Sequence, residues 1–414
     1  MKKLLVVLAV LVSVLMVGTA FAYNLSYSPE FIRTQSRNAS TDVDAAIYNP
    51  AGLVMLQNGL YINVANNMAY IKYSHTDPVQ GNKEVSADTI SWLTPDFNIV
   101  YKQDKWAAFV NMFVIDGGAA LEYKGSPLGF ASSQLVDEYG LVGIGTGAGQ
   151  GLIDKASSGY GLLAFSYGAS YALTDMVAFS AGLRNFYYFG ETKYHGYVNP
   201  GLGALELNYK ENLSAWGTGG FIGLNITPMK DMNIGISYQT AAVLYGTAET
   251  KTTLGTTTKS EDGYADEASL PAYLALGVGY NVMPELNVQL SYTLTFEGER
   301  KWGKDTEYTI NADRKNTHAI GLGAEYKVND MIKASGGVLY STTGDTDDTQ
   351  NPYSPGLDKV AIGVGAAITA MPGLTIDLGL VDNIFLSQKV KDLGDTELKK
   401  TIWGWGIGVT YKAM

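Results

Sequence analysis

The chain has 414 residues, of which 46% are hydrophobic, 11% aromatic and only 17% charged. The charged share is below the roughly 25% of an ordinary globular domain. The 48 glycines make up about 12% of the chain, above the usual glycine share of roughly 7%. The absence of cysteine excludes disulfide scaffolds, thiol nucleophiles and cysteine-ligated metal sites. Beyond the first 22 residues, no apolar run reaches the roughly 18 residues that a membrane-spanning helix needs.

The amino terminus has the three parts of a secretory signal. Met1–Lys3 is cationic, Leu4–Val17 is apolar, and Ala20–Ala22 offers small residues at the two positions that signal peptidase reads. We therefore predict that residues 1–22 are a signal peptide. Without its two lysines the chain has 27 basic and 40 acidic residues, a net charge of −13. This balance, and the lack of a basic cluster, exclude nucleic acid as a partner.

From about residue 58 onward, apolar residues recur at every second position, which is the period of a β-strand with different surroundings on its two faces. In the last such segment Trp403, Trp405, Ile407, Val409 and Tyr411 alternate with Gly404, Gly406, Gly408 and Thr410. A soluble two-sheet sandwich is the alternative, but its outward face would be polar. Here the apolar face opposes small residues, which fits lipid outside and a lumen inside.

We predict an all-β fold, a 14-stranded antiparallel transmembrane β-barrel formed by residues 58–414. Short turns alternate with longer polar loops, as in outer-membrane barrels whose short turns are periplasmic. The predicted strands lie near residues 58–73, 88–102, 105–123, 158–174, 176–197, 204–227, 231–250, 266–282, 286–302, 306–328, 331–343, 358–370, 374–391 and 397–412.

Residues 23–57 do not alternate and contain short helical patterns, so we expect them to form a small plug, or hatch, in the lumen. Their rigid turn comprises Asn49, Pro50, Ala51 and Gly52. Together with the stretch from Ser36 to Leu53, the segments Pro95–Tyr101 and Lys105–Phe109 carry a family pattern. On these residues the chain resembles the outer-membrane long-chain fatty acid transporters of the FadL type, which include aromatic hydrocarbon channels.

The resemblance implies that loops capture a hydrophobic substrate, which passes through the plugged lumen and leaves sideways through an opening in the third strand. At that position Asp116, Gly117 and Gly118 stand where the family usually has Pro-Phe-Gly. Two adjacent glycines can form a bulge or interrupt strand pairing. The alternative is that these glycines end the strand and lead into the extracellular loop.

The third strand is apolar on both faces, and the loop from 124 to 157 is unusually apolar. An exposed apolar patch of this kind often marks a binding site, although packing against a neighbouring loop is an alternative. A fatty acid would also need a cation, for which Arg184, Arg33 and Arg37 are available. The alternative is that such a lumen charge is paired with an inward acid such as Glu325 or Asp377. The predicted substrate-binding residues are Phe109, Phe113, Ile115, Leu128, Phe130, Leu135, Leu141 and Arg184.

Catalysis has little support, because His75, His195 and His318 lie on different strands without a nucleophile motif. We expect no enzyme activity, cofactor or metal. The expected protein is a monomeric uptake channel in the outer membrane of a diderm bacterium, surrounded by outer-membrane lipid, with fatty acids or hydrocarbons as its partners. The alternatives are a general porin, or an adhesin acting through loops such as 250–265.

Overall fold

The structure is a computed structural model that describes residues 28–77, 82–124, 153–198, 205–299, 314–351, 354–391 and 395–413. The predicted signal peptide lies outside this described part. Among the described residues, no helix is both long enough and apolar enough to cross a bilayer.

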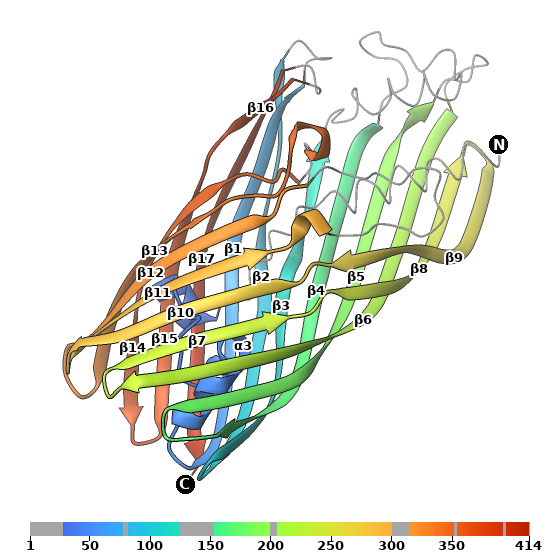
Figure 1. Cartoon of the computed structure of the whole chain (residues 1–414). Helices are drawn as coiled ribbons and strands as arrows, with labels where there is room; N and C mark the ends of the chain where they lie inside the picture. Colours follow the sequence, from blue (N-terminus) through green and yellow to red (C-terminus); the bar gives the residue numbers. More distant parts are fainter. Residues whose placement is uncertain are drawn as a thin grey trace.

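Strands account for most of the chain, and short helices precede or interrupt them (Figure 1). The helical elements are α2 (Pro29–Thr34), α3 (Ala45–Tyr48), η1 (Pro50–Met55), η3 (Glu297–Glu299) and η4 (Asp347–Thr349). The strands are β1 (Gly59–Asp77), β2 (Lys83–Gln103), β3 (Trp106–Lys124), β4 (Ile153–Ala172), β5 (Val177–Val198), β6 (Leu205–Met229), β7 (Met232–Gln239), β8 (Ala242–Leu254), β9 (Thr257–Leu270), β10 (Tyr273–Met283), β11 (Leu286–Thr295), β12 (Thr317–Lys327), β13 (Ile332–Ser341), β14 (Lys359–Met371), β15 (Leu374–Phe385), β16 (Gln388–Val390) and β17 (Thr396–Ala413).

The strands form one antiparallel sheet that closes on itself. β1 pairs with β17, with Leu60 opposite Ala413, so the first strand meets the last. Of the seventeen strands in the sheet, β8 continues β7, β10 continues β9 and β16 continues β15, each after a short break. The fold is therefore the predicted closed barrel of fourteen antiparallel strands. Closure gives a partner to backbone groups that an open sheet edge would leave unpaired in lipid.

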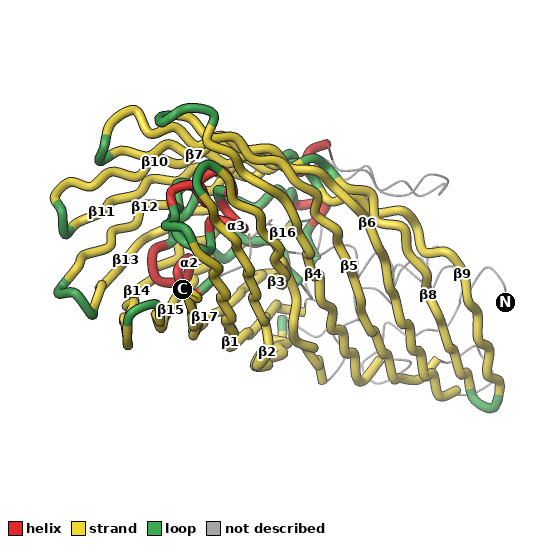
Figure 2. The backbone as a smooth tube through the Cα atoms, turned by 90° about the horizontal axis from the view of Figure 1, so that it is seen from below, coloured by secondary structure: helices red, strands yellow, loops and turns green. Residues whose placement is uncertain are grey.

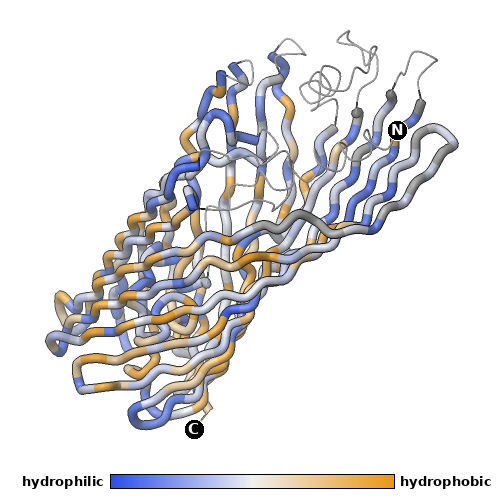
Figure 3. Tube along the Cα trace, turned by 45° about the vertical axis from the view of Figure 1, so that its right-hand side comes forward, coloured by the Kyte–Doolittle hydropathy of each residue, from blue (hydrophilic) through white to orange (hydrophobic). Residues whose placement is uncertain are grey.

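The two faces of the wall differ as the alternation predicts. On β17, Trp403, Ile407 and Val409 are exposed on the outside, whereas Gly404, Gly406 and Gly408 are buried toward the lumen. Figure 3 shows hydrophobic and hydrophilic residues alternating along the strands. The mean hydropathy of the chain is +0.01, and this value is an average over a lipid-facing surface and a lumen-facing surface.

Some predicted boundaries are wrong on the extracellular side. Residues 250–265, predicted as a loop, belong to β8 and β9, which are joined by a turn at Gly255. The strand predicted at 286–302 ends at Thr295 and is followed by η3. The strand predicted at 306–328 begins at Thr317 within the described residues. Strand ends that extend beyond the bilayer need no apolar face, so alternation does not reveal them.

The described part of the hatch lies inside the barrel, where Figure 2 shows its helices surrounded by strands. Helix α2 packs against strands β12 to β15, β17 and β1, and η1 packs against strands β2 to β7. Between them, Asn38 donates hydrogen bonds to the carbonyls of Leu276 on β10 and Tyr292 on β11. The hatch therefore touches the barrel wall around its circumference.

Glycines in the wall give α2 its space. Gly323 on β12 and Gly337 on β13 lie directly opposite each other, and a Cβ atom on either would overlap the carbonyl oxygen of Thr34. Gly363 on β14 has the same relation to the carbonyl of Ile32. Part of the unusual glycine content is therefore a requirement of close packing between hatch and wall.

We predict that Gly337→Val displaces α2, because the added side chain overlaps the backbone at Thr34. Overpacking of this kind costs about 1–3 kcal/mol, and hydrogen exchange of residues 29–37 should accelerate accordingly. The matched control is Gly336→Val, whose side chain points outward, where the nearest heavy atom to a Cβ is 3.6 Å away. Equal exchange rates in the two variants would contradict the fit.

Candidate substrate cavity and wall opening

Helix α2 forms because its sequence supplies both ends. The hydroxyl oxygen of Ser28 accepts a hydrogen bond from the amide of Phe31 (3.1 Å), and Pro29 occupies the first turn, where no amide donor is needed. The helix ends at Gln35, whose φ of 55° is left-handed. This short helix directs the Arg33 side chain toward strands β12 and β15 of the wall.

Arg33 joins the hatch to two wall strands. Its Nη1 lies 2.5 Å from Oε1 of Glu325 on β12, and its Nη2 lies 3.2 Å from Oδ1 of Asp377 on β15. All three side chains are buried. Breaking one partner of a buried ion pair typically costs about 3–5 kcal/mol, because the other charge is left unpaired. These ion pairs hold α2 against the wall.

Arg37 organises the chain that follows α2. It contacts Asp44 (2.6 Å), Asp42 (2.8 Å) and, at 3.3 Å, Glu325. Asp44 also accepts a hydrogen bond from the hydroxyl of Ser40 (2.7 Å). The residues that carry the family pattern thus fold around one buried guanidinium group.

Glu30 lies beside this network and is also buried. Burial raises the pKa of its carboxyl well above the usual value, and the Asp377 and Asp44 carboxylates add to this rise. Glu30 therefore favours its neutral form, and the two hatch arginines are balanced by the other carboxylates.

The predicted hatch residues are buried between α3, η1 and the wall. The side-chain amide of Asn49 donates to the Ser40 carbonyl (3.0 Å) and to Asn225 on β6 (2.8 Å). Ser170 on β4 donates to the Pro50 carbonyl (2.6 Å). Ala51 and Gly52 are also buried. The turn at 49–52 is therefore tied to two strands rather than loosely placed.

Arg184 lies on the lumen face of β5 but is engaged by its surroundings. Its Nε donates to Ser166 (2.8 Å), Nη1 to the hydroxyl of Tyr273 (3.0 Å) and Nη2 to the carbonyl of Ile47 (3.4 Å). The guanidinium also lies over the ring of Phe113, 5.0 Å from its centroid. The alternative pairing of a lumen cation with Glu325 or Asp377 is confirmed for Arg33, whereas Arg184 bonds Ser166, Tyr273 and Ile47 instead. Arg184 thus supports α3.

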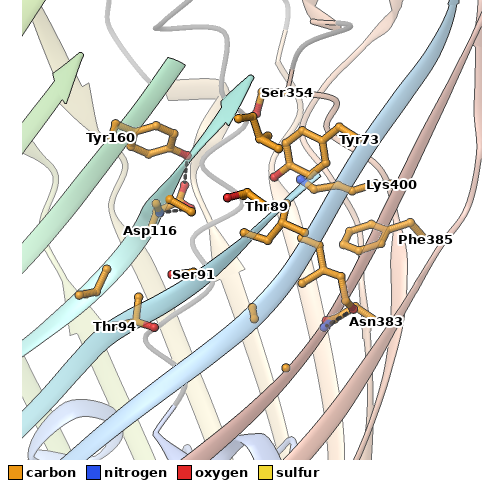
Figure 4. Close-up of a pocket in the computed structure, with 18 of the residues that line it drawn as sticks. Tyr73, Thr89, Ser91, Thr94, Asp116, Tyr160, Ser354, Asn383, Phe385 and Lys400 are labelled. Carbon is orange, nitrogen blue, oxygen red and sulfur yellow. Dashed lines mark hydrogen bonds between the residues drawn. The ribbon is translucent and has the colours of Figure 1, made fainter. Parts of the chain in front are cut away.

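A cavity of about 250 Å³ lies in the lumen, and we call it the lumen cavity (Figure 4). It has more apolar than polar lining, contributed by strands β1 to β5, β13 to β15 and β17 and by α2. Ile32 of α2 lines it from the hatch, and Leu357, before β14, lines it from the loop. Apolar lining residues include Ile71, Val114, Ile115, Leu121 and Ile402. Such an enclosure suits an apolar ligand.

Two lysines line the same cavity. Lys400 on β17 lies over the ring of Tyr73, with its Nζ 4.5 Å from the centroid, and donates to the carbonyl of Pro355 at 3.3 Å. Lys359 on β14 is buried, and both lysine Nζ atoms lie over the ring of Phe385, at 5.9 Å for Lys359 and 5.3 Å for Lys400. A largely apolar cavity thus contains two lysine side chains.

The third strand carries two register shifts opposite β4, between Val114 and Asp116 and between Gly117 and Ala119. Gly117 and Gly118 have φ values of 83° and 102°, which favour glycine. Asp116 accepts hydrogen bonds from the hydroxyl of Tyr160 (2.9 Å) and the amide of Gly117 (2.7 Å). Because β3 continues to Lys124, these glycines do not end the strand.

The bulged part of β3 lies beside an unpaired stretch of wall. β2 and β3 pair only from Asp96 to Gln103 and from Phe113 to Trp106. Above this level β2 pairs with β1 except at the bulged Trp92 and Leu93, and β3 pairs with β4 except at Ile115 and Gly118. We call this unpaired boundary the β2–β3 seam. The Ser91 hydroxyl donates a hydrogen bond across it to the Gly118 carbonyl (3.0 Å).

The lumen cavity lies against this seam. Thr89, Ser91 and Thr94 of β2 line it together with Asp116 and Gly117 of β3. The predicted wall-opening residues and the cavity therefore meet at the same place. Pro95, which has no amide donor, stands where pairing with β3 stops.

The predicted substrate-binding residues are separated by the structure. Ile115 lines the lumen cavity. Phe113 packs with Ile47 and Tyr48 of α3, and Phe109 packs with Ala45 and Leu53 lower in the hatch. Both phenylalanines thus contact the hatch. Leu128, Phe130, Leu135 and Leu141 lie outside the described residues.

Sequence reasoning missed Lys359, Lys400 and Tyr160. The alternation contains a signal for the two lysines, because Lys400 shares its parity with the lumen-facing Gly404, and Lys359 shares its parity with Ala361. If the alternation is extended to the ends of β14 and β17, it predicts that both lysine side chains face the lumen.

Within the described part of the chain, no group of three or more histidines, aspartates or glutamates could hold a metal ion. His318 is engaged with the hydroxyl of Tyr292 at 2.9 Å, and His195 lies 3.2 Å from Glu206.

Comparison with known proteins identifies the family. The sequence profile of the outer membrane protein transport family (OMPP1/FadL/TodX) matches residues 34–413. Comparison with curated protein sequences finds no significant match.

Solved structures share the fold at low sequence identity. A Pseudomonas aeruginosa FadL homologue is 17% identical with a TM-score of 0.70, covering 93% of this chain and 98% of that one. The P. putida toluene transporter TodX is 16% identical with a TM-score of 0.69 and coverages of 94% and 98%. The Ralstonia pickettii toluene transporter TbuX is 16% identical with a TM-score of 0.66 and coverages of 95% and 100%.

The profile match extends over residues 34–413 of the 414-residue chain and agrees with the barrel. The chain therefore belongs to the FadL/TodX family of outer-membrane transport proteins for hydrophobic compounds, which are channels and not enzymes.

Proposed function

We propose that this protein takes up long-chain fatty acids or similar amphiphiles, which consist of a long apolar body and an anionic head. The supporting observation is the lumen cavity, which combines apolar walls with Lys359 and Lys400 and lies against the β2–β3 seam. We also propose that residues 1–22 are removed and that residues 23–57 remain as the hatch.

The two lysines favour an acid over a neutral hydrocarbon. An ammonium group in an apolar cavity loses hydration, and a carboxylate restores a strong, charge-assisted partner. The aromatic faces of Tyr73 and Phe385 stabilise the cations without neutralising them. Toluene, named for two of the structural relatives, offers no such anion.

The proposed route of release follows from two features, the hatch that occupies the lumen and the unpaired β2–β3 seam. The hatch touches the wall around the lumen and is held by Arg33 and Arg37, which disfavours a straight path to the periplasm. The β2–β3 seam instead borders the cavity directly. We propose that substrate captured by the extracellular loops leaves sideways through this seam into the membrane.

The same geometry separates this proposal from a general porin. A porin needs an open, hydrated lumen, whereas here the hatch occupies it. We predict that liposomes containing the intact protein remain poorly permeable to small sugars, and that deletion of residues 23–57 raises conductance. Rapid liposome swelling in sugar with the intact protein would favour the porin.

The anion-binding role has its own prediction. Lys400→Gln and Lys359→Gln should each weaken binding of a long-chain fatty acid by about tenfold, because one charge-assisted contact contributes about 1.5–3 kcal/mol. Binding of the alcohol with the same chain should change little. Isothermal titration calorimetry in detergent measures both.

The matched control is Lys399→Gln, since Lys399 is adjacent in sequence but exposed and paired with Glu397 at 3.0 Å. A parallel loss of acid and alcohol binding would mean that the lysines only shape the cavity. Unchanged binding of the acid would remove them from the proposed site.

A further inference from the structure

Three lysines stand directly opposite one another on neighbouring strands. Lys193 on β5 is in register with Lys210 on β6, which is in register with Lys251 on β8. Like charges in directly opposed positions destabilise a sheet. In a chain with a strong excess of acidic residues, this arrangement calls for a physical reason.

The lysines lie on the outer face of the barrel. Residues of one parity on a strand share a face, and Lys210 has the parity of Trp216 and Ile222, which are 56% and 52% exposed. Lys251 has the parity of Tyr245, which is 64% exposed. The three ammonium groups therefore face away from the lumen.

Their height above the bilayer follows from an aromatic row on the same strands. Tyr187, Trp216 and Tyr245 are in register with one another, and the first two rings are 4.2 Å apart. Exposed aromatic rows mark the edge of the apolar band. Each lysine lies six residues beyond this row, which is roughly 15 Å further along the membrane normal for a tilted strand.

That height exceeds an ordinary phospholipid headgroup, which adds only roughly 5–8 Å on each side of the hydrocarbon core. The strands β5, β6 and β8 extend away from the hatch toward the opposite end of the barrel (Figure 1). Only a lipid with a large headgroup would extend to the level of the lysines.

The lysines line a groove of about 590 Å³, together with Lys155, Asn208 and Thr253. We call it the lysine groove. Glu191 is paired with both Lys193 and Lys210. Lys155 pairs with Glu122 at 2.9 Å.

Other acids lie near the groove, and among them Asp262 on β9 is exposed and directly opposite Glu249 on β8. Glu206 is engaged with His195 at 3.2 Å, and Glu249 lies on β8 two residues nearer the membrane than Lys251. Lys251 has no ion-pair partner among the side chains that the structure describes. Among the described side chains, the four ammonium groups form ion pairs with only two carboxylates, those of Glu122 and Glu191, which leaves capacity for an external anion.

We propose that the lysine groove binds the anionic saccharide headgroup, bearing phosphate and carboxylate groups, of a glycolipid in the outer leaflet. The ammonium groups hold these anions by charge-assisted hydrogen bonds, while the aromatic row below contacts the acyl region. The contact fixes one side of the barrel in the leaflet. It is independent of the cargo bound in the lumen.

The test compares the wild type and two triple variants of the full-length protein in nonionic detergent. The quantity measured is the retention of rough lipopolysaccharide, which carries a phosphorylated inner core. Native mass spectrometry should show that Lys193→Gln/Lys210→Gln/Lys251→Gln lowers the bound fraction by at least about tenfold. The matched control, Lys389→Gln/Lys391→Gln/Lys399→Gln, removes three exposed lysines around β16 and the start of β17 and should retain the glycolipid.

Equal retention by the two triple variants would overturn the proposal. Equal retention of phosphatidylglycerol by the wild type would overturn the assignment to a large headgroup, and equally tight binding of pyrophosphate would assign the groove to free anions. Fatty acid binding by the groove variant should remain normal, and its heat-modifiable gel mobility verifies folding. A failure of the glycolipid proposal therefore leaves the proposed fatty acid uptake unaffected. A failure of the fatty acid proposal likewise leaves the glycolipid proposal unaffected.

Discussion

The need to pair every backbone amide inside a bilayer governs this structure. Fourteen antiparallel strands satisfy it by closing β1 against β17. Against this requirement, the β2–β3 seam is the informative exception. Ladder pairing stops at Asp96 and Phe113, and two register shifts in β3 keep the backbone close to β4 instead. An interruption that lipid disfavours, placed beside an apolar cavity, fits a path between the lumen and the membrane.

The hatch supports the proposed sideways path, because it occupies the lower lumen. Gly323 and Gly337 bring α2 against the wall, and Arg33 locks it there through Glu325 and Asp377. These contacts are individually ordinary but act together, since the close approach allowed by glycine brings the guanidinium to its acids. The hatch therefore fills the lower lumen. The upper lumen retains the cavity, with Lys359 and Lys400 as its cationic groups.

Alternation predicted the barrel well because lipid and lumen select different residues on the two faces of each strand. It failed where that contrast ends, as in β8 and β9 beyond the bilayer, where residues 250–265 resembled a loop. The glycines of β3 were visible in the sequence, but the seam depends on which neighbours β2 and β3 choose. Likewise, Arg33 meets an acid 292 residues away, and Arg184 is engaged by Tyr273 and α3. Local pattern does not encode such long-range pairings.

The proposed release of substrate through the β2–β3 seam is tested most directly by cross-linking, because the chain has no cysteine. Ser91→Cys with Ala119→Cys places one thiol on each side of the seam, and a short bismaleimide joins them. The account predicts that this bridge lowers uptake of a labelled fatty acid to about a tenth or less. A bridge between Ile99→Cys and Val110→Cys, which are already paired in register, should leave uptake unchanged. Full uptake with the seam bridged would contradict lateral release.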